Sequence, residues 1–498
     1  MTLQIILGPP GTGKTTTLLN LLEEHLAKGV HPSKIGFISF TRKAAYEGRD
    51  RAIERFGFLE EETPYFRTLH SLAFRQLGLS HTQLMQKAHY LEIADKLGIE
   101  LTAHLDFTEG SAYGTLPGDF LIFIEGLSRL RRVSLRQQWE EMNDDRVDWY
   151  ELELVAQSLR NYKKENMLYD FTDTLTRCYE EGALPRLDVL FVDEVQDFSP
   201  LQWLLIERLI STSGVSYLAG DDDQAIFSWA GADVKHFIEL AGDRVVLQQS
   251  HRIPKVVHDK AMEIAGNISH RSEKVFKPRD LIGSLSYHLD VESIDLSNGE
   301  WLCLARSRRQ LYAYEQVCKQ MGYHYAIFDR SPAYSDEYYG IKTLERLMNG
   351  SEVRVDQARN VLALCSKANS KALKNIDDES NVGLTWLNTN CSLPIPRDWT
   401  SWDKVLDKIH IDDAEYFQLA FDRGEKLDEK PRVRLSTIHG IKGGEADNVA
   451  ILTDIYSRVY DGMIQNPDDE HRVFYVGVTR AKEMLHIVQP HSMRFYEL

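Results

Sequence analysis

Cysteine is scarce in this sequence. Five cysteines occur among 498 residues, and no two of them form a Cys-x-x-Cys pair: Cys178, Cys303, Cys318, Cys365 and Cys391. This spacing argues against a disulfide framework or a zinc or iron–sulfur site. Long hydrophobic runs are also lacking, because the apolar start at residues 3–7 is too short for a signal-peptide core and no later run approaches a membrane span. We therefore expect a soluble, intracellular, cytoplasmic protein with free thiols and no membrane contact.

Positive charge is in deficit. The chain has 58 Lys and Arg residues against 75 Asp and Glu residues, a formal net charge of −17. Net charge reports on solubility and not on where basic groups gather, so it leaves a nucleic-acid partner open. The length and the 43% hydrophobic content predict more than one domain with a substantial core.

A glycine-rich loop near the N-terminus is the first strong signal. A short apolar strand at residues 5–7 runs into this loop, and a leucine-rich helix follows it. Glycines there let successive backbone N–H groups point at phosphate oxygens, and the helix N-terminus adds its dipole. Lys14 then reaches the β- and γ-phosphates and the Thr15 hydroxyl binds Mg²⁺, whereas the alternative is a glycine-rich turn without a ligand. The predicted nucleotide-binding residues are Gly8, Pro9, Pro10, Gly11, Thr12, Gly13, Lys14, Thr15 and Thr16.

Two adjacent carboxylates end another apolar strand, at residues 187–193. Asp193 is expected to hold Mg²⁺, and Glu194 to orient the attacking water and accept its proton. A solvent-exposed acidic strand end is the alternative. It fits poorly beside a phosphate-binding loop.

Aromatic and basic residues suggest a nucleic-acid contact. The strand at residues 35–40 ends on Phe40, which Thr41, Arg42 and Lys43 follow; the alternative is a buried ring beside a solvated helix face. Residues 67–72 are predicted to form a polar loop before a helix. Residues 79–165 have helical spacing, and within them four arginines are candidate phosphate contacts or a solvated face: Arg129, Arg131, Arg132 and Arg136.

Several short motifs follow one another along the chain. After the phosphate loop come Phe-Thr-Arg-Lys-Ala-Ala at 40–45, Asp-Glu-Val-Gln-Asp at 193–197 and Gly-Asp-Asp-Asp-Gln at 220–224, which continues to residue 232. Further motif segments lie at residues 247–252, 304–307, 436–445 and 470–481. This order resembles the UvrD/Rep/PcrA-like branch of superfamily 1 DNA helicases, and the resemblance covers nearly the whole chain.

This resemblance implies an α/β fold with two RecA-like P-loop NTPase domains, each with an inserted, mainly helical subdomain, and ATP in the cleft between them. The first domain is expected at residues 1–78 and 166–240, interrupted by a helical insertion at 79–165. The second is expected at 241–330 and 430–498, interrupted by a reduced accessory insertion at 331–429.

The resemblance also implies roles for single residues. Gln224 would sense the γ-phosphate, Arg252 and Arg480 would act as arginine fingers, and Glu445 would contact the ribose. His251 stands where relatives have an adenine-stacking tyrosine, Ala230 replaces a usual arginine, and only seven residues precede Gly8, so the adenine-reading glutamine segment of relatives is not matched. The DNA contacts implied are Phe40, Thr41, Arg42, His70, Phe227, Trp229 and His439.

The function that follows is an ATP- and Mg²⁺-dependent helicase or translocase on single-stranded DNA and DNA junctions, with 3′→5′ polarity by resemblance and a role in DNA repair or replication. We expect a monomer in solution that works with or without a protein loading partner. Two alternatives remain open: an ATPase subunit of a larger repair or recombination assembly, and a catalytically silent interaction protein. A helicase–nuclease is disfavoured, because no nuclease-like cluster follows Arg480 in the 498 residues.

Overall fold

The computed structural model describes residues 2–40, 42–103, 116–144, 146–182, 184–328, 330–395 and 401–498. The side chains of residues 42–44, 47–48 and 51–52 are not described. Two predicted DNA contacts, Thr41 and the side chain of Arg42, therefore lie outside the described part of the chain. No helix among the described residues is both long and apolar enough to cross a membrane.

A six-stranded parallel sheet forms the first domain, in the order β3-β2-β4-β5-β1-β6. Its central strands are almost wholly apolar and buried, as expected for parallel strands covered on both faces. Ile5 and Leu7 of the first strand pack into the core on one face, while Ile6 packs with Leu18 and Leu22 on the other. The strands are β1 (Thr2–Leu7), β2 (Ile35–Ser39), β3 (Phe66–Thr68), β4 (Val189–Asp193), β5 (Val215–Gly220) and β6 (Asp243–Val246).

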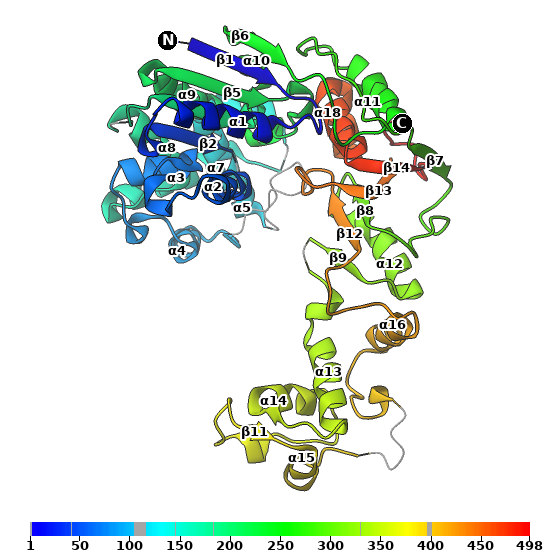
Figure 1. The fold of residues 1–498 in the computed structure, drawn as a ribbon. Helices are drawn as coiled ribbons and strands as arrows, with labels where there is room; N and C mark the ends of the chain where they lie inside the picture. The colour runs from blue at the N-terminus through cyan, green and yellow to red at the C-terminus, as the bar shows by residue number, and fades with distance from the viewer. Residues whose placement is uncertain are drawn as a thin grey trace.

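Helices cover both faces of this sheet (Figure 1). They are α1 (Lys14–Ala27), α2 (Arg42–Phe56), α3 (Leu69–Gln76), α8 (Phe171–Glu180), α9 (Pro200–Thr212) and α10 (Val234–Glu239). Four further helices lie between α3 and α8 in the sequence and share a separate apolar core: α4 (Lys87–Leu97), α5 (Pro117–Arg131), α6 (Leu135–Met142) and α7 (Trp149–Asn166).

A second six-stranded parallel sheet has the order β7-β14-β13-β8-β12-β9. Its strands are β7 (Ser284–His288), β8 (Trp301–Ala305), β9 (Tyr325–Ile327), β12 (Val433–Thr437), β13 (Ala446–Leu452) and β14 (Ala481–Val488). The helices that accompany it are α11 (Lys255–Gly266), α12 (Leu311–Met321), α17 (Ser457–Gln465) and α18 (Pro467–Val478). The α/β class with two parallel-sheet domains is thus confirmed.

The chain between β9 and β12 forms an arm. Figure 1 shows α13, α14 and α15 extending away from both sheets. Buried residues of this arm join those of the second sheet in one continuous apolar cluster, in which Tyr416 and Phe417 pack near Tyr325. The elements are α13 (Asp336–Met348), β10 (Val353–Arg354), α14 (Val355–Ala363), β11 (Asn381–Val382), α15 (Leu384–Cys391) and α16 (Ile411–Asp422).

Two local predictions need correction. The first sheet does not end at residue 240, because β6 pairs in parallel with β1 through Val246; this edge strand is mostly exposed and begins with Asp243-Arg244, so its strand signal is weak. Residues 67–72 are not a polar loop. They complete β3 and begin α3, with the Thr68 hydroxyl capping the helix by accepting from the Ser71 N–H at 3.2 Å.

Candidate nucleotide and nucleic-acid site

The glycine-rich loop wraps around the side chain of Lys14. The Lys14 amine donates to the Gly8 carbonyl at 3.0 Å, and a Cβ placed on Gly8 would lie 2.0 Å from Lys14 Cγ. Gly11 and Gly13 have φ of +72° and +82°, in the left-handed region that favours glycine. The loop conformation therefore depends on glycine at these positions.

Residues after β6 close over the same loop from the second domain. His251 N–H donates to the Gly11 carbonyl at 2.8 Å, and the Ser250 hydroxyl donates to the Pro10 carbonyl at 2.8 Å. A Cβ on Gly11 would lie 2.3 Å from Cβ of Arg252. The two domains are thus in direct contact at the phosphate loop.

The two predicted carboxylates follow β4 and face the start of α1. The Thr15 hydroxyl donates to Asp193 at 3.0 Å, and the Lys14 amine lies 3.8 Å from Glu194. Burial, together with the Glu194 charge, raises the pKa of Asp193 to about 6. Burial alone would also raise the pKa of Glu194, but the charges of Lys14 and Lys442 outweigh it and lower that pKa.

This arrangement fits Mg²⁺ and a general base. The Thr15 and Asp193 oxygens are hard donors at adjacent positions, the kind that Mg²⁺ prefers. Glu194 stays ionised and keeps 28% of its side chain exposed. It is therefore able to accept a proton from a water molecule.

Arginines of the second domain reach the same place. Arg480 is buried and donates from Nη2 to Gln224 Oε1 at 3.0 Å, while Arg252 Nε donates to Glu445 at 2.5 Å. Burial and the neighbouring Arg252 charge lower the pKa of Arg480 to about 9. The guanidinium is thus still protonated at neutral pH, and its desolvation cost is offset once an anion binds.

A cavity of about 400 Å³ brings the predicted residues together. With the exception of Gly8, which lies behind Lys14, every predicted nucleotide-binding, metal and catalytic residue lines it. The lining residues are Pro9, Pro10, Gly11, Thr12, Gly13, Lys14, Thr15, Thr16, Asp193, Glu194, Gln224, His251, Arg252, Lys442, Gly443, Glu445, Arg480 and Lys482.

Two lysines of this cavity carried no predicted role. Lys442 pairs with Asp197 and donates to the Gln224 carbonyl at 2.8 Å, and its amine lies 5.1 Å from the centre of the Phe227 ring. Lys482 lies two residues after Arg480. Lys442 lies in the motif at residues 436–445, so the sequence indicated the importance of this segment but not the contacts of Lys442.

A row of aromatic rings lies beside the cavity. Phe40 stacks on Phe227 at 5.8 Å, and Phe227 and Trp229 each lie 6.4 Å from His439. Trp229 and His439 also line an adjoining cavity of about 270 Å³. Burial and the charges of Arg306 and Lys442 lower the pKa of His439 well below its ordinary value, so this imidazole is neutral.

His70 is separate from this row. It lines a different cavity, of about 320 Å³, together with Arg67, Ser71 and Phe171. Its ring lies 6.0 Å from that of Phe171. The predicted DNA contacts that the structure describes thus fall into two groups. Phe40, Phe227 and Trp229 of the first domain meet His439 of the second domain, whereas His70 lies apart on the first domain.

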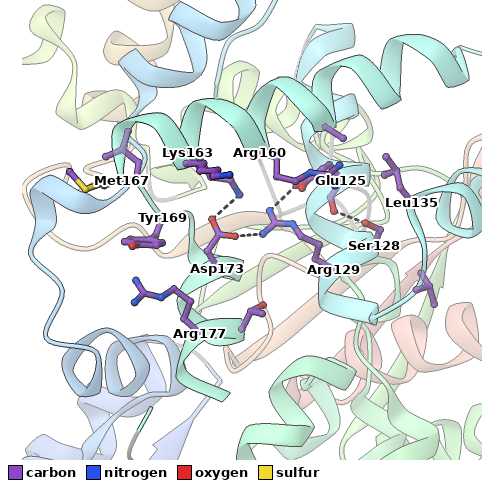
Figure 2. A pocket seen from close by; sticks show the side chains of 15 residues that line it. Glu125, Ser128, Arg129, Leu135, Arg160, Lys163, Met167, Tyr169, Asp173 and Arg177 are labelled. Carbon is purple, nitrogen blue, oxygen red and sulfur yellow. Dashed lines mark hydrogen bonds and ion pairs between the residues drawn. The ribbon is translucent and has the colours of Figure 1, made fainter. Parts of the chain in front are cut away.

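The arginine cluster of the helical insertion has a structural role. Figure 2 shows Arg129 directed at carboxylates inside a cavity of about 630 Å³. It donates to Glu125, Asp170 and Asp173 at 2.6–2.9 Å. Arg131 pairs with Glu141 and Arg136 with Glu140. Acidic partners therefore hold these three arginines, and two partners of Arg129, Asp170 and Asp173, lie at the start of α8. These ion pairs favour a structural role over the predicted phosphate contacts.

Comparisons with known proteins agree with the motif order. The UvrD/REP helicase N-terminal domain matches residues 2–244, and the UvrD-like helicase C-terminal domain matches residues 411–491. The chain is 26% identical over 304 residues to the ATP-dependent DNA helicase PcrA of Staphylococcus aureus, covering 54% of this chain and 39% of that protein. It is 26% identical over 318 residues to the ATP-dependent DNA helicase Rep of Buchnera aphidicola, covering 59% and 45%.

A third relative is the putative ATP-dependent DNA helicase YjcD of Bacillus subtilis, 25% identical over 258 residues, which cover 48% of this chain and 32% of that protein. The chain thus spans less than half the length of the curated relatives it matches. An arterivirus nonstructural protein 10 (helicase) structure covers 99% of this chain at 12% identity with a TM-score of 0.32, a value that supports no conclusion.

Proposed function

The chain belongs to the UvrD/Rep/PcrA-like family of superfamily 1 helicases, and on that premise we propose that it is an ATP-hydrolysing motor that moves along single-stranded DNA. The observation that carries the proposal is the shared cavity. A phosphate loop and two carboxylates from the first domain meet two arginines from the second domain across about 400 Å³.

The chemistry follows from the charges in this cavity. Lys14 and the loop N–H groups bind the ATP phosphates. Thr15 and Asp193 would hold Mg²⁺, which would supply charge neutralisation at the phosphate oxygens. Glu194 accepts a proton from the attacking water. Arg480 and Arg252 stabilise the charge that develops on the transferred phosphoryl group.

Hydrolysis is coupled to movement because both domains contribute to one site. Arg480 and Arg252 favour the closed cleft while the γ-phosphate is present, and the cleft reopens when that group is lost. Lys442 contacts both the cavity and Phe227 of the aromatic row. Opening of the cleft is thereby transmitted to Phe227 and Trp229, on which bases stack.

DNA-stimulated ATPase activity separates the candidate functions in a first test. A motor hydrolyses ATP faster when single-stranded DNA is added, and Lys14→Ala and Glu194→Gln abolish hydrolysis, the second with ATP still bound. A silent interaction protein shows no turnover. A subunit of a larger assembly is indicated if stimulation appears only after a partner protein is added.

The small accessory arm suggests limited unwinding by a single molecule. Separation of strands costs about 1.4 kcal/mol per base-pair step. The family resemblance implies larger insertions in relatives that flank the duplex, and this arm would offer less contact with it. We expect translocation, by resemblance 3′→5′, with unwinding that falls off with duplex length and recovers when several molecules load. Single-turnover unwinding with a protein trap tests this, and equal efficiency on short and long duplexes would contradict it.

Binding to DNA is expected to be strongly salt-dependent. The net charge of −17 means that a local basic track must hold the phosphates. We further propose that the protein acts as a monomer in DNA repair or replication, with or without a protein partner that loads it onto DNA.

A further inference from the structure

A buried ionic cluster joins the two domains behind the nucleotide cavity. Three consecutive aspartates, Asp221, Asp222 and Asp223, follow β5 of the first domain, and their side chains are 0–1% exposed. Lys274 comes from the segment between α11 and β7 of the second domain and is 1% exposed. Its amine lies 2.8, 2.6 and 2.9 Å from the three carboxylates.

The Lys274 amine donates hydrogen bonds to Asp221 and Asp222, and it forms an ion pair with Asp223. Arg271 adds a two-pronged pair to Asp223, at 2.9 and 2.5 Å. Burial alone would lower the pKa of Lys274, but the three carboxylates raise it above its ordinary value. The lysine is therefore permanently charged, and it is the cation that all three aspartates share.

Asp221 contacts Gln224, which lines the nucleotide cavity. Asp221 Oδ1 accepts from Lys274, and its other oxygen accepts from Gln224 Nε2 at 2.6 Å. Gln224 Oε1 in turn accepts from Arg480 at 3.0 Å. A continuous chain of contacts thus runs from Lys274 through Asp221 and Gln224 to Arg480.

This chain determines which way the Gln224 amide faces. Because Asp221 is an acceptor, it fixes Nε2 on its side, which leaves Oε1 facing Arg480. Without the lysine, Asp221 and Asp222 would lose their ion-pair partner in a dry site, while Arg271 would still hold Asp223. Asp221 would then take up a proton or move away. Either change removes the constraint on Gln224.

The Lys274 segment also supports the second arginine. Lys277 N–H donates to the Gln248 carbonyl at 2.7 Å, and Ser250 N–H donates to the Lys277 carbonyl at 2.9 Å. These bonds hold the residues immediately before Arg252. One segment of the second domain therefore sits behind both arginines of the cavity.

From this geometry we infer that Lys274 is a positioning residue for ATP hydrolysis, acting through Asp221 on Gln224 and Arg480. The inference rests on the proposed ATPase function. It assigns a part in the reaction to a side chain that does not reach the nucleotide cavity.

A double-mutant cycle tests it. Lys274→Met should lower the DNA-stimulated kcat by about 10- to 100-fold, as small misplacements of catalytic groups do, with little change in the KM for ATP. In a Gln224→Ala background the same substitution should cause little further loss, because the contact that it acts through is already gone. Losses that multiply would overturn the inference.

A matched control separates positioning from stability. Lys163, in the helical insertion, is 9% exposed and pairs with Asp170 and Asp173 at 2.6 and 2.7 Å. Lys163→Met should lower the melting temperature without lowering kcat in a folded sample; equal kcat losses in the two lysine variants would overturn the inference.

A variant that does not fold, and a failure of the proposed ATPase function, can each be told apart from a failure of the inference about Lys274. If Lys274→Met does not fold, the isosteric Asp221→Asn takes its place in the same cycle with the same expected results. A wild-type protein without ATPase activity would contradict the proposed function. An active wild type with independent, multiplying losses would contradict only the role of Lys274.

Discussion

Replacing Arg480 by lysine should nearly abolish hydrolysis while leaving ATP bound. The Arg480 guanidinium donates to Val476 O, Gly444 O, Gln224 Oε1 and Thr479 Oγ1 at 2.9–3.3 Å. A lysine amine is a single nitrogen, so it cannot occupy these directions together. Its ordinary pKa is also about two units lower than that of arginine, so the burial that brings Arg480 to about 9 brings a lysine much closer to deprotonation.

The expected magnitude follows from the role of such arginines. A loss of about 10³–10⁵ in kcat corresponds to about 4–7 kcal/mol of transition-state stabilisation. ATP binding should change much less, because the contact strengthens as charge develops during phosphoryl transfer. The assay is single-turnover hydrolysis at saturating single-stranded DNA, beside an equilibrium measurement with a fluorescent ATP analogue.

The control is Arg129→Lys, which alters a partly buried arginine held by Asp170 and Asp173 outside the cavity. That variant should hydrolyse ATP at the wild-type rate. If Arg480→Lys keeps more than a tenth of wild-type kcat, or if both variants lose the same activity, the assignment of Arg480 to the transition state is refuted.

Three further outcomes are expected. Trp229→Ala should weaken single-stranded DNA binding by about 1–3 kcal/mol in a filter-binding assay. It should also remove the stimulation of ATPase activity by DNA without lowering basal turnover. A lower melting temperature with unchanged DNA affinity would favour a core role for Trp229. Gly11→Ala should prevent the close contact between the phosphate loop and Arg252, because φ is +72° and the new Cβ would lie 2.3 Å from Arg252 Cβ. The affinity for ATP, measured by titration, should therefore fall. An affinity equal to that of the wild-type protein would show that the loop tolerates a side chain at this position. Burial raises the pKa of Asp197 to about 6 despite the opposing charge of Lys442, so the folded state holds a proton more tightly than the unfolded state. The ionised form therefore costs stability above pH 6, so the free energy of urea unfolding of the wild-type protein should fall by about 1–3 kcal/mol from pH 4 to pH 8 relative to that of Asp197→Asn, whose side chain does not ionise. The same pH dependence in both proteins would contradict this reasoning.

Features that depend on short-range order were predictable from the sequence. The strand, glycine loop and helix around Lys14 are continuous in the chain, and their steric requirements are visible residue by residue. The carboxylate pair at Asp193 was equally visible, because it directly follows an apolar strand. The α/β class with two domains was implied by the family resemblance that these motifs carry.

Features that depend on partners distant in the sequence were not predictable. In the sequence Arg129 has no evident acidic partner, because Asp170 and Asp173 lie 41 and 44 positions further along the chain and only the fold brings them into contact with it. The ion pairs of Lys274 likewise form only because the fold places a segment of the second domain against the aspartates that follow β5. The edge strand β6 escaped detection because exposed strands carry little apolar pattern.

The central claim is that hydrolysis in the shared cavity drives movement along single-stranded DNA. The most direct measurement is stopped-flow translocation on strands of increasing length, with a fluorophore at the 5′ end and a trap that prevents rebinding. The time at which the signal appears should grow linearly with strand length when ATP is present, and Glu194→Gln should remove this dependence while still binding ATP and DNA. An arrival time that is independent of strand length in the wild-type protein would contradict the account.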